Sequence, residues 1–173
     1  MMNCIIVDDE PIARRGMERI VSRHPQLNLL GTLDSAEAAA AFMTDNQVDL
    51  VFLDIQMPGT DGLEFARRIP EKTLVIFTTA YPEYAVDSYS VDAVGYLVKP
   101  IDTVLFDKAV AKALDYKALM AQATAEQADA RSVRDYMIVK ADRRFHLIPY
   151  REILFIEGLK DYVIFRLAEG RRL

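Results

Sequence analysis

The sequence predicts an α/β protein built on a doubly wound, five-stranded parallel sheet, followed by a long linker helix and a short, incomplete all-β segment. Three observations predict this fold. Short apolar runs alternate with helical stretches through the first part of the chain. The run that begins at Val51 has no polar alternation, as expected for a strand covered on both faces. From Tyr136 onward the apolar period changes to two, which is typical of strands.

Five apolar runs are the expected strands of the parallel sheet, and turn or capping residues close each of them. In chain order they are Cys4–Val7, Leu27–Thr32, the run from Val51 to Ile55, Leu74–Thr79 and Gly95–Val98. Each right-handed crossover between parallel strands lays its helix on the sheet. The alternation of strands and helices therefore implies a sheet that is wrapped on both faces.

Capping and turn residues mark the expected helices between these strands. Pro11 suits the first turn of a helix that ends near Pro25. Ser35 caps an Ala-rich helix that reaches about Asp45. Two further helices are expected over Leu63–Ile69 and Pro82–Tyr89.

A fifth helix is expected to begin at Asp102 or Thr103 and to run to about Ala130. At 1.5 Å per residue it would be about 42 Å long, which is more than one small domain covers. Its second half, Ala121–Arg131, holds almost no large apolar side chain, which favours a linker over a coiled-coil seam. The sequence therefore predicts a first domain at residues 1–118, a linker at 119–132 and a β segment at 133–173.

The C-terminal segment is predicted to consist of short strands separated by turns. Their apolar positions are Tyr136, Ile138 and Val139; Phe145, Leu147 and Ile148; Ile153–Ile156; and Tyr162–Phe165. The sequence stops at Leu173 within a basic run. We therefore expect a β fold that is cut short and that has an unpaired edge.

Composition and charge limit the class of protein. The one cysteine, Cys4, has apolar neighbours, which indicates a buried thiol and excludes an internal disulfide framework. No apolar run approaches the roughly 18 residues that span a bilayer, so we expect a cytoplasmic protein without membrane insertion. Residues 1–131 hold 12 Lys and Arg against 20 Asp and Glu, whereas residues 132–173 hold 9 against 6. An acidic first part thus precedes a basic C-terminal segment.

Polar residues gather at the carboxyl ends of the expected strands. Asp8 and Asp9 follow the first strand, Asp54 stands at the carboxyl end of the third, Thr78 and Thr79 end the fourth, and Lys99 ends the fifth. These ends share one edge of a parallel sheet, where ligands bind in such folds. Three carboxylates in a small volume require a compensating cation, and Mg²⁺ prefers such oxygen ligands. At this edge Asp54 can attack phosphorus, while Lys99 and a Thr hydroxyl hold phosphoryl oxygens.

Each of these residues also has a purely structural explanation. Asp8 and Asp54 can cap the turns that follow them, Thr79 can satisfy a strand end, and Tyr96 can belong to the core. Their joint position at one edge, in this order along the chain, favours the functional interpretation.

The motifs at this edge resemble those of the receiver domains of two-component response regulators, which implies a flavodoxin-like fold. The matching residues are Val7–Glu10; Leu53–Pro58 with Gly59, Asp61 and Gly62; Thr79 and Ala80; and Gly95–Pro100. The resemblance implies that Asp54 accepts a phosphoryl group from a sensor histidine kinase. It also implies that Asp9, Asp54 and the backbone carbonyl of Gln56 ligate Mg²⁺, with Asp8 acting through a water.

The same resemblance assigns roles to residues around the phosphoacceptor. Thr79 matches the switch hydroxyl because an alanine follows it, and Tyr96 matches the aromatic residue that reorients when that hydroxyl engages the phosphoryl group. Lys99 matches the lysine of the family, whose bond to the next proline is commonly cis. Gln56 and Tyr81 occupy the positions that tune the lifetime of the acyl phosphate.

The β segment resembles the opening of a LytTR-type (LytR/AlgR) DNA-binding domain, which reads DNA with loops of a β fold. The matching order is Lys140–Asp142, Ile148–Tyr150, Ile153–Glu157, Tyr162 and Val163. The domain of that family is longer, so most base-contacting loops are expected beyond this segment. Basic residues of the segment can meet DNA phosphates in the intact protein or can simply be solvated turns. They are Arg143, Arg144, Lys160, Arg171 and Arg172.

These resemblances together predict a transcriptional regulator that is switched by phosphorylation and that forms a homodimer, with strand exchange through the β segment as one geometry. Two alternatives stay open: a receiver that signals through protein contacts without DNA, and an Mg²⁺-dependent phosphatase of the haloacid dehalogenase type. Such phosphatases place a second Asp two residues after the nucleophile, where this chain has Gln56. We therefore expect only Mg²⁺-dependent self-phosphorylation from a phosphodonor and slow autodephosphorylation.

Overall fold

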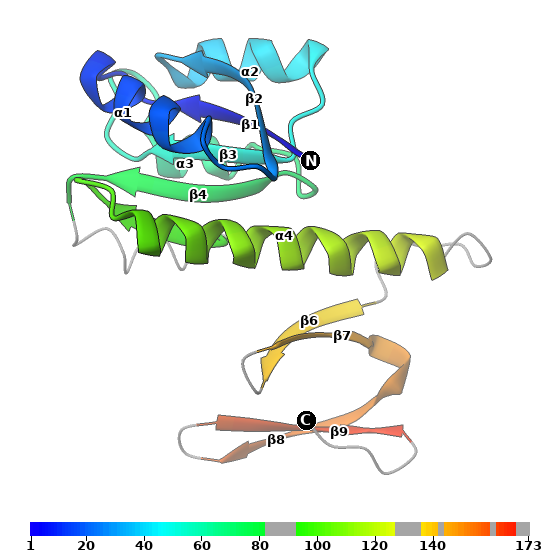
Figure 1. Cartoon of the computed structure of the whole chain (residues 1–173). Coiled ribbons are helices and arrows are strands. Elements are labelled where there is room, and N and C mark those ends of the chain that lie inside the picture. The colour runs from blue at the N-terminus through cyan, green and yellow to red at the C-terminus, as the bar shows by residue number, and fades with distance from the viewer. Residues whose placement is uncertain (82–92, 127–135, 142–143, 160–161, 169–173) are drawn as a thin grey trace. The chain divides into compact units, whose positions relative to one another are not determined.

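Parallel strands and their crossover helices make up the first of two units in the computed structural model, Met1–Leu114 and Asp115–Leu173. The structure describes residues 1–81, 93–126, 136–141, 144–159 and 162–168 (Figure 1). The helix expected over Pro82–Tyr89 lies outside these ranges.

The sheet of the first unit has the strand order β2-β1-β3-β4-β5, and all neighbouring strands are parallel (Figure 1). The strands are β1 (Met2–Val7), β2 (Leu27–Leu33), β3 (Leu50–Asp54), β4 (Leu74–Thr79) and β5 (Gly95–Val98). The prediction of a doubly wound, five-stranded parallel sheet is confirmed. The strand order reverses beside β1 and β3, so the crevice expected at such a switch point lies at the carboxyl ends of these two strands.

Three short helices connect the strands of this sheet: α1 (Pro11–Val21), α2 (Ala36–Asp45) and α3 (Gly62–Ala66). Helix α1 begins with Pro11 as expected, but it ends at Val21, before the expected stop near Pro25. The Ser35 side chain accepts a hydrogen bond from the Ala38 amide at 3.3 Å, which confirms the cap of α2. Helix α3 ends at Ala66 instead of Ile69, and the amide of its C-cap residue bonds to Leu63 and Phe65 carbonyls.

A long helix, α4 (Thr103–Glu126), follows β5. The Asp102 carboxylate accepts hydrogen bonds from the Val104 and Leu105 amides at 2.8 and 3.0 Å, so Asp102 is the cap of this helix. The expected continuation to Ala130 lies outside the described residues. No helix in the described ranges combines the length and hydropathy that a membrane span requires.

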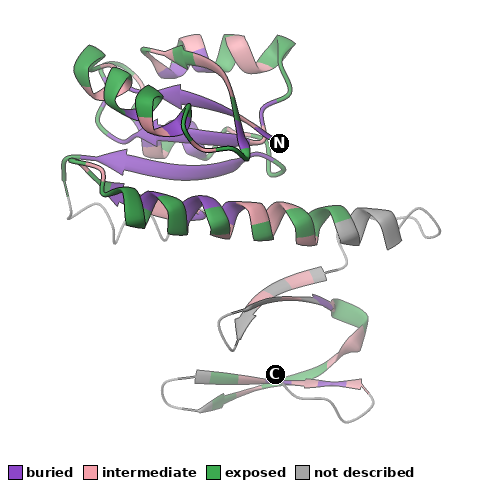
Figure 2. Ribbon diagram, in the orientation of Figure 1, coloured by how far each residue is buried: buried purple, intermediate pink, exposed green. Residues whose placement is uncertain are grey.

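Helices cover both faces of the sheet, so its central strands are buried along their length (Figure 2). Alternating strand residues, such as Ile5 and Val7, pack with α2 and α3 in one cluster. On the opposite face Phe52 stacks on Phe106 of α4, with ring centroids 5.5 Å apart. Burial of β3 on both faces explains why its sequence lacks polar alternation until Asp54.

The second unit contains four described strands in two antiparallel hairpins, which confirms the all-β prediction. They are β6 (Tyr136–Ala141) with β7 (Arg144–Pro149), and β8 (Ile153–Leu159) with β9 (Tyr162–Leu167). A single 3₁₀ turn, Tyr150–Glu152, joins the hairpins. Ile148, Phe165 and Leu167 form a small buried cluster. Several apolar side chains of β8, among them Leu154 and Phe155, are exposed.

Candidate functional site

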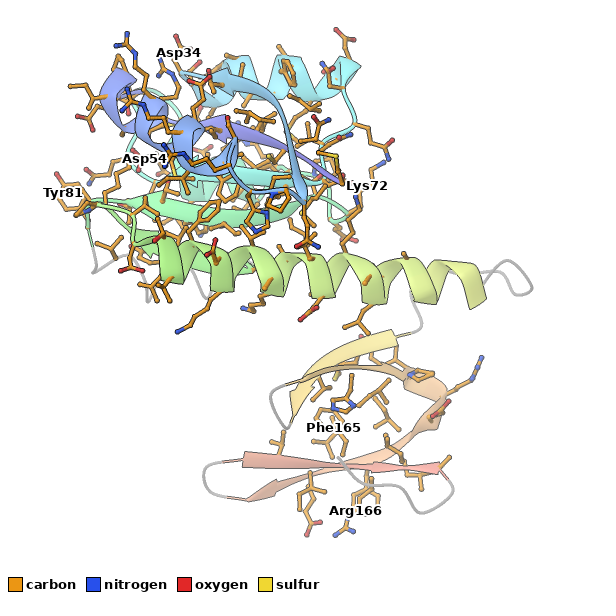
Figure 3. The ribbon with its side chains drawn as sticks, in the orientation of Figure 1. Asp34, Asp54, Lys72, Tyr81, Phe165 and Arg166 are labelled. Carbon is orange, nitrogen blue, oxygen red and sulfur yellow. The ribbon has the colours of Figure 1, made fainter. Side chains whose placement is uncertain are left out.

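The carboxyl ends of β1 and β3 place two buried acidic residues side by side. Asp54 is the last residue of β3, and Asp8 directly follows β1. The register pairs Val7 with Leu53, so the next residue of each strand reaches the same edge of the sheet. Figure 3 shows Asp54 and Tyr81 toward this end of the sheet and Lys72 at the opposite end. The expectation that the polar residues of separate strands share one edge is met.

Lys99 joins the two buried carboxylates. Its Nζ lies 2.7 Å from Asp8 Oδ2 and 2.8 Å from Asp54 Oδ2. Lys99 follows β5, and its amide donates to the Thr79 carbonyl at 2.7 Å, so its side chain crosses the end of β4 to reach the carboxylates. The Lys99–Pro100 peptide bond is cis, as the family resemblance implied.

Three carboxylates form a cluster that fits a hard divalent cation. One oxygen from each of Asp8, Asp9 and Asp54 lies within 4.8 Å of the others. Asp54 Oδ1 is buried and has no hydrogen-bond partner among the described residues. A buried acceptor without a partner is costly, and a bound cation would satisfy it. The donor set of carboxylate oxygens is the kind that Mg²⁺ prefers.

Burial and charge set the protonation of this cluster. Burial raises the pKa of the Asp54 carboxyl, and the hydrogen bond and charge of Lys99 oppose this effect without cancelling it. Burial acts to lower the pKa of Lys99, but its hydrogen bonds to Asp54 and Asp8 outweigh burial, so its pKa is raised. The metal-free site thus holds a firmly protonated lysine beside a carboxyl group that resists ionisation.

The backbone of Tyr81 is hydrogen-bonded to the side chains of both Thr79 and Tyr96. The buried Thr79 Oγ1 accepts from the Tyr81 amide at 3.2 Å. The Tyr96 hydroxyl, from β5, donates to the Tyr81 carbonyl at 2.5 Å. The two predicted switch residues therefore bind opposite sides of the same short segment. Thr78, which precedes Thr79, pairs with Asp54 in the β-ladder.

The loop between β3 and α3 folds tightly around the Asp54 backbone. The Gly62 amide donates to the Ile55 carbonyl at 2.8 Å, and a Cβ atom at Gly62 would lie 2.0 Å from the Asp54 carbonyl oxygen. Gly59 has a φ of +83°, which favours glycine. Asp61 caps α3 through a 2.7 Å bond from the Glu64 amide. Gln56, the predicted carbonyl ligand and lifetime residue, lies exposed on this loop.

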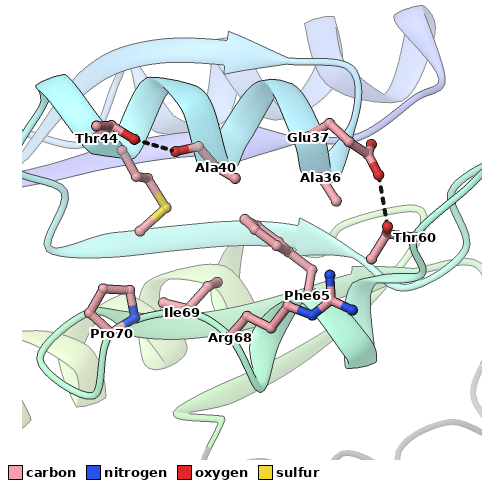
Figure 4. Close-up of a pocket in the computed structure, with 10 residues that line it drawn as sticks. Ala36, Glu37, Ala40, Thr44, Thr60, Phe65, Arg68, Ile69 and Pro70 are labelled. Carbon is pink, nitrogen blue, oxygen red and sulfur yellow. Dashed lines mark hydrogen bonds between the residues drawn. The ribbon is translucent and has the colours of Figure 1, made fainter.

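A side-chain contact that the sequence did not reveal ties this loop to α2. The Thr60 hydroxyl donates to Glu37 Oε1 at 2.7 Å (Figure 4). This hydrogen bond lowers the pKa of the Glu37 carboxyl. It stands at the rim of a cavity of about 310 Å³ between α2 and α3, whose other lining residues include Met43 and Phe65. No periodicity or motif signals this pair, because both residues are ordinary surface types.

The remaining predicted residues fall into two groups. Cys4 is buried, as expected, and burial raises the pKa of its thiol to about 12. The proposed DNA contacts are largely untested by the structure. Arg144 begins β7, whereas Arg143, Lys160, Arg171 and Arg172 lie outside the described residues.

Sequence comparison places the chain beside regulators of signal transduction. A family model for the response regulator receiver domain matches residues 4–111. The chain is 36% identical over 175 residues to the positive alginate biosynthesis regulatory protein of Pseudomonas aeruginosa, an alignment that covers 98% of this chain and 71% of that protein. It is 30% identical over 159 residues to the sensory transduction protein LytT of Enterococcus faecalis, covering 90% of this chain and 64% of that protein.

Structural comparison gives the same fold for the first unit. The response regulatory domain of mrkE from Klebsiella pneumoniae matches with a TM-score of 0.63 and 29% identity, covering 68% of this chain and 99% of that one. The response regulator TrrA from Thermotoga maritima, solved in complex with Mg²⁺ and BeF, matches with a TM-score of 0.58 and 32% identity. That match covers 65% of this chain and 99% of that one.

Proposed function

This chain belongs to the response regulator receiver family, and from that premise we propose that Asp54 accepts a phosphoryl group from a sensor histidine kinase. The position and surroundings of the Asp54 carboxylate carry the assignment. Asp54 ends the central strand, its Oδ2 contacts Lys99 Nζ at 2.8 Å, and its buried Oδ1 has no partner among the described residues. An oxygen that is both buried and unpartnered is available to a ligand or a reacting atom.

The proposed transfer uses one oxygen of Asp54 as the nucleophile. A lone pair of the carboxylate forms the new O–P bond, while the P–N bond to the donor imidazole breaks and its electron pair stays on that nitrogen. Lys99 Nζ, held at the carboxylate by two ion pairs, stabilises charge on the phosphoryl oxygens. Asp8, Asp9, Asp54 and the Gln56 carbonyl would hold Mg²⁺, with Asp8 acting through a water. The ion supplies neutralisation of the negative charges that meet there.

The switch is proposed to run through the Tyr81 backbone. When the Thr79 hydroxyl bonds to a phosphoryl oxygen, its present acceptor bond from the Tyr81 amide must weaken or rearrange. The Tyr96 hydroxyl donates to the Tyr81 carbonyl, so a shift of the Tyr81 backbone changes the position of the Tyr96 side chain. Gln56 and Tyr81 are proposed to tune how fast water removes the phosphoryl group, and the exposure of both side chains supports this.

The proposed output is regulation of transcription through a LytTR-type DNA-binding domain, of which the C-terminal β segment is the first part. The alignment with the alginate regulatory protein supports this output because it covers nearly the whole chain, β unit included. We further propose that the protein acts as a homodimer in the cytoplasm, where both its kinase partner and its DNA target are accessible. Arg143, Arg144 and Lys160 are the candidates for contacts with DNA phosphates. Family membership favours this function over a haloacid dehalogenase phosphatase; self-phosphorylation and slow autodephosphorylation are the expected chemistry.

Intact-mass spectrometry tests the acceptor. The full chain, incubated with acetyl phosphate and Mg²⁺, should gain the mass of one phosphoryl group, and Asp54→Asn should abolish this gain. Asp45→Asn, at an exposed carboxylate outside the cluster, is the matched control and should phosphorylate like the wild type. A phosphoryl group that persists in Asp54→Asn would move the acceptor to another residue.

A further inference from the structure

Arg14 reaches back from the first turns of α1 to the end of β1. Its guanidinium donates a hydrogen bond to the main-chain carbonyl of Asp8. Its own amide bonds to the Glu10 carbonyl at 3.0 Å within the helix. We propose that Arg14 is a positioning residue that fixes the Asp8–Asp9 turn for Mg²⁺ binding. This inference rests on the proposed metal site.

The Asp8 carbonyl needs a donor that the sheet does not supply. The ladders of β1 with β2 and β3 end at Val7, and the Asp8 amide bonds to the Leu33 carbonyl at 3.1 Å. Asp8 is fully buried, so its carbonyl is largely shielded from water. A buried backbone carbonyl that lacks a partner is costly, and Arg14 removes this cost with a charged donor.

The turn that carries Asp9 has few other anchors. Glu10, the N-cap of α1, makes no side-chain cap, and Pro11 has no amide hydrogen to donate. The Glu10 amide donates to Asp8 Oδ1 at 3.0 Å. In the described part of the chain, Asp9 thus lies between that bond and the one from Arg14. These two hydrogen bonds therefore fix the backbone from which the half-buried Asp9 carboxylate projects.

Position and charge predict opposite effects for the loss of Arg14. If the hydrogen bond from Arg14 orders the Asp8–Asp9 turn before the ion binds, Mg²⁺ binding costs less conformational entropy. Loss of this hydrogen bond should therefore weaken Mg²⁺ binding. A guanidinium also repels a cation, so loss of its charge alone should tighten binding. Arg15, the exposed neighbour on α1, has the same charge, and within the described residues its side chain makes no hydrogen bond to the turn. Arg15→Met therefore measures the effect of charge alone.

The experiment is an Mg²⁺ titration of the full-length, unphosphorylated chain, followed by backbone amide NMR. We expect Arg14→Met to raise the Mg²⁺ dissociation constant about tenfold, the lower end of the range for groups that orient metal ligands. Arg14→Lys, which keeps a charged donor but not the planar guanidinium, should recover only part of this loss. Arg15→Met should bind as well as the wild type or slightly better.

The outcomes separate the two levels of the proposal. A wild type that fails to bind Mg²⁺ would refute the metal site itself. If the wild type binds and Arg14→Met binds equally or more tightly, the metal site stands and the positioning role of Arg14 is refuted. The NMR spectrum of each metal-free variant reports whether it is folded. Should Arg14→Met fail to fold, Arg14→Lys must bind Mg²⁺ more weakly than Arg15→Lys, and equal binding would overturn the proposal.

Discussion

The pKa of the Asp54 carboxyl differs from that of a free aspartate. Burial raises its pKa above the ordinary value of 3.8, despite the neighbouring Lys99. The folded state therefore keeps a proton on Asp54 at pH values where the unfolded chain has released it. Because the folded state then binds more protons, the contribution of Asp54 to the free energy of unfolding falls as pH rises from about 4 through the raised pKa.

We predict that Asp54→Asn stabilises the metal-free protein, increasingly so as pH rises over this window. The amide cannot ionise, so the penalty of burying a charge disappears. The pKa of Lys99 is raised by its hydrogen bonds to Asp54 and Asp8 despite burial, so its own titration adds no pH dependence within this window. Urea unfolding of both proteins between pH 4 and 8 measures the difference, and Asp45→Asn is the control. A difference that shrinks with rising pH would contradict the inferred environment of Asp54.

Binding of Mg²⁺ should offset the destabilising effect of the buried Asp54 charge. An ion that neutralises the cluster binds only the folded state, so Mg²⁺ at ten times its dissociation constant should stabilise the wild type by about 1.4 kcal/mol. Chelation should remove this gain, and Asp54→Asn should show little of it because one ligand is lost. Thermal unfolding with and without Mg²⁺ is the measurement. An equal Mg²⁺ effect in both proteins would indicate that the ion binds elsewhere.

The loop from β3 to α3 makes glycine obligatory at one position. A Cβ at Gly62 would lie 2.0 Å from the carbonyl oxygen of Asp54, which is a backbone atom and cannot rotate away as a flexible side chain could. We predict that Gly62→Ala costs about 3 kcal/mol of stability, the upper part of the range for overpacking, and displaces the phosphoacceptor. Urea unfolding and the rate of phosphorylation from acetyl phosphate measure the two effects.

Gly16 provides the matched control for this substitution. It lies within α1, and a Cβ there meets nothing within 4 Å. Gly16→Ala should therefore stabilise the protein by about 0.5 to 1 kcal/mol, because alanine is the better helix former. Equal effects of the two substitutions would show that the tight contact at Gly62 relaxes freely.

The elements of the first unit follow from the sequence because their patterns are local. The unbroken apolar run of β3 and the capping Ser35 each fix an element within a few residues. The contacts that hold the site are not local, and residue types alone do not reveal them. Arg14 and the Glu37–Thr60 pair look like solvated surface residues until the fold brings each to its partner. The same holds for Gly62, whose need for glycine arises only when the loop returns to Asp54.

On the scale of the whole chain, α4 contributes to the first unit more than a linker would. Phe106, Val110 and Ala113 are buried, and Phe106 stacks on Phe52 of the central strand. The first compact unit ends at Leu114, within α4. The first three turns of α4 are therefore part of the receiver core.

This division predicts how the chain tolerates truncation. A fragment of residues 1–118 should fold and accept a phosphoryl group like the full chain, because it keeps the buried α4 residues Phe106, Ala109, Val110 and Ala113. A fragment of residues 1–102 should not fold, because removal of α4 exposes Phe52 and its apolar neighbours. In the full chain, Phe106→Ala should cost about 3 to 5 kcal/mol, as expected for a large buried aromatic side chain. Circular dichroism and intact-mass measurements decide the matter: a folded fragment 1–102, or an unfolded fragment 1–118, would show that the receiver core ends elsewhere.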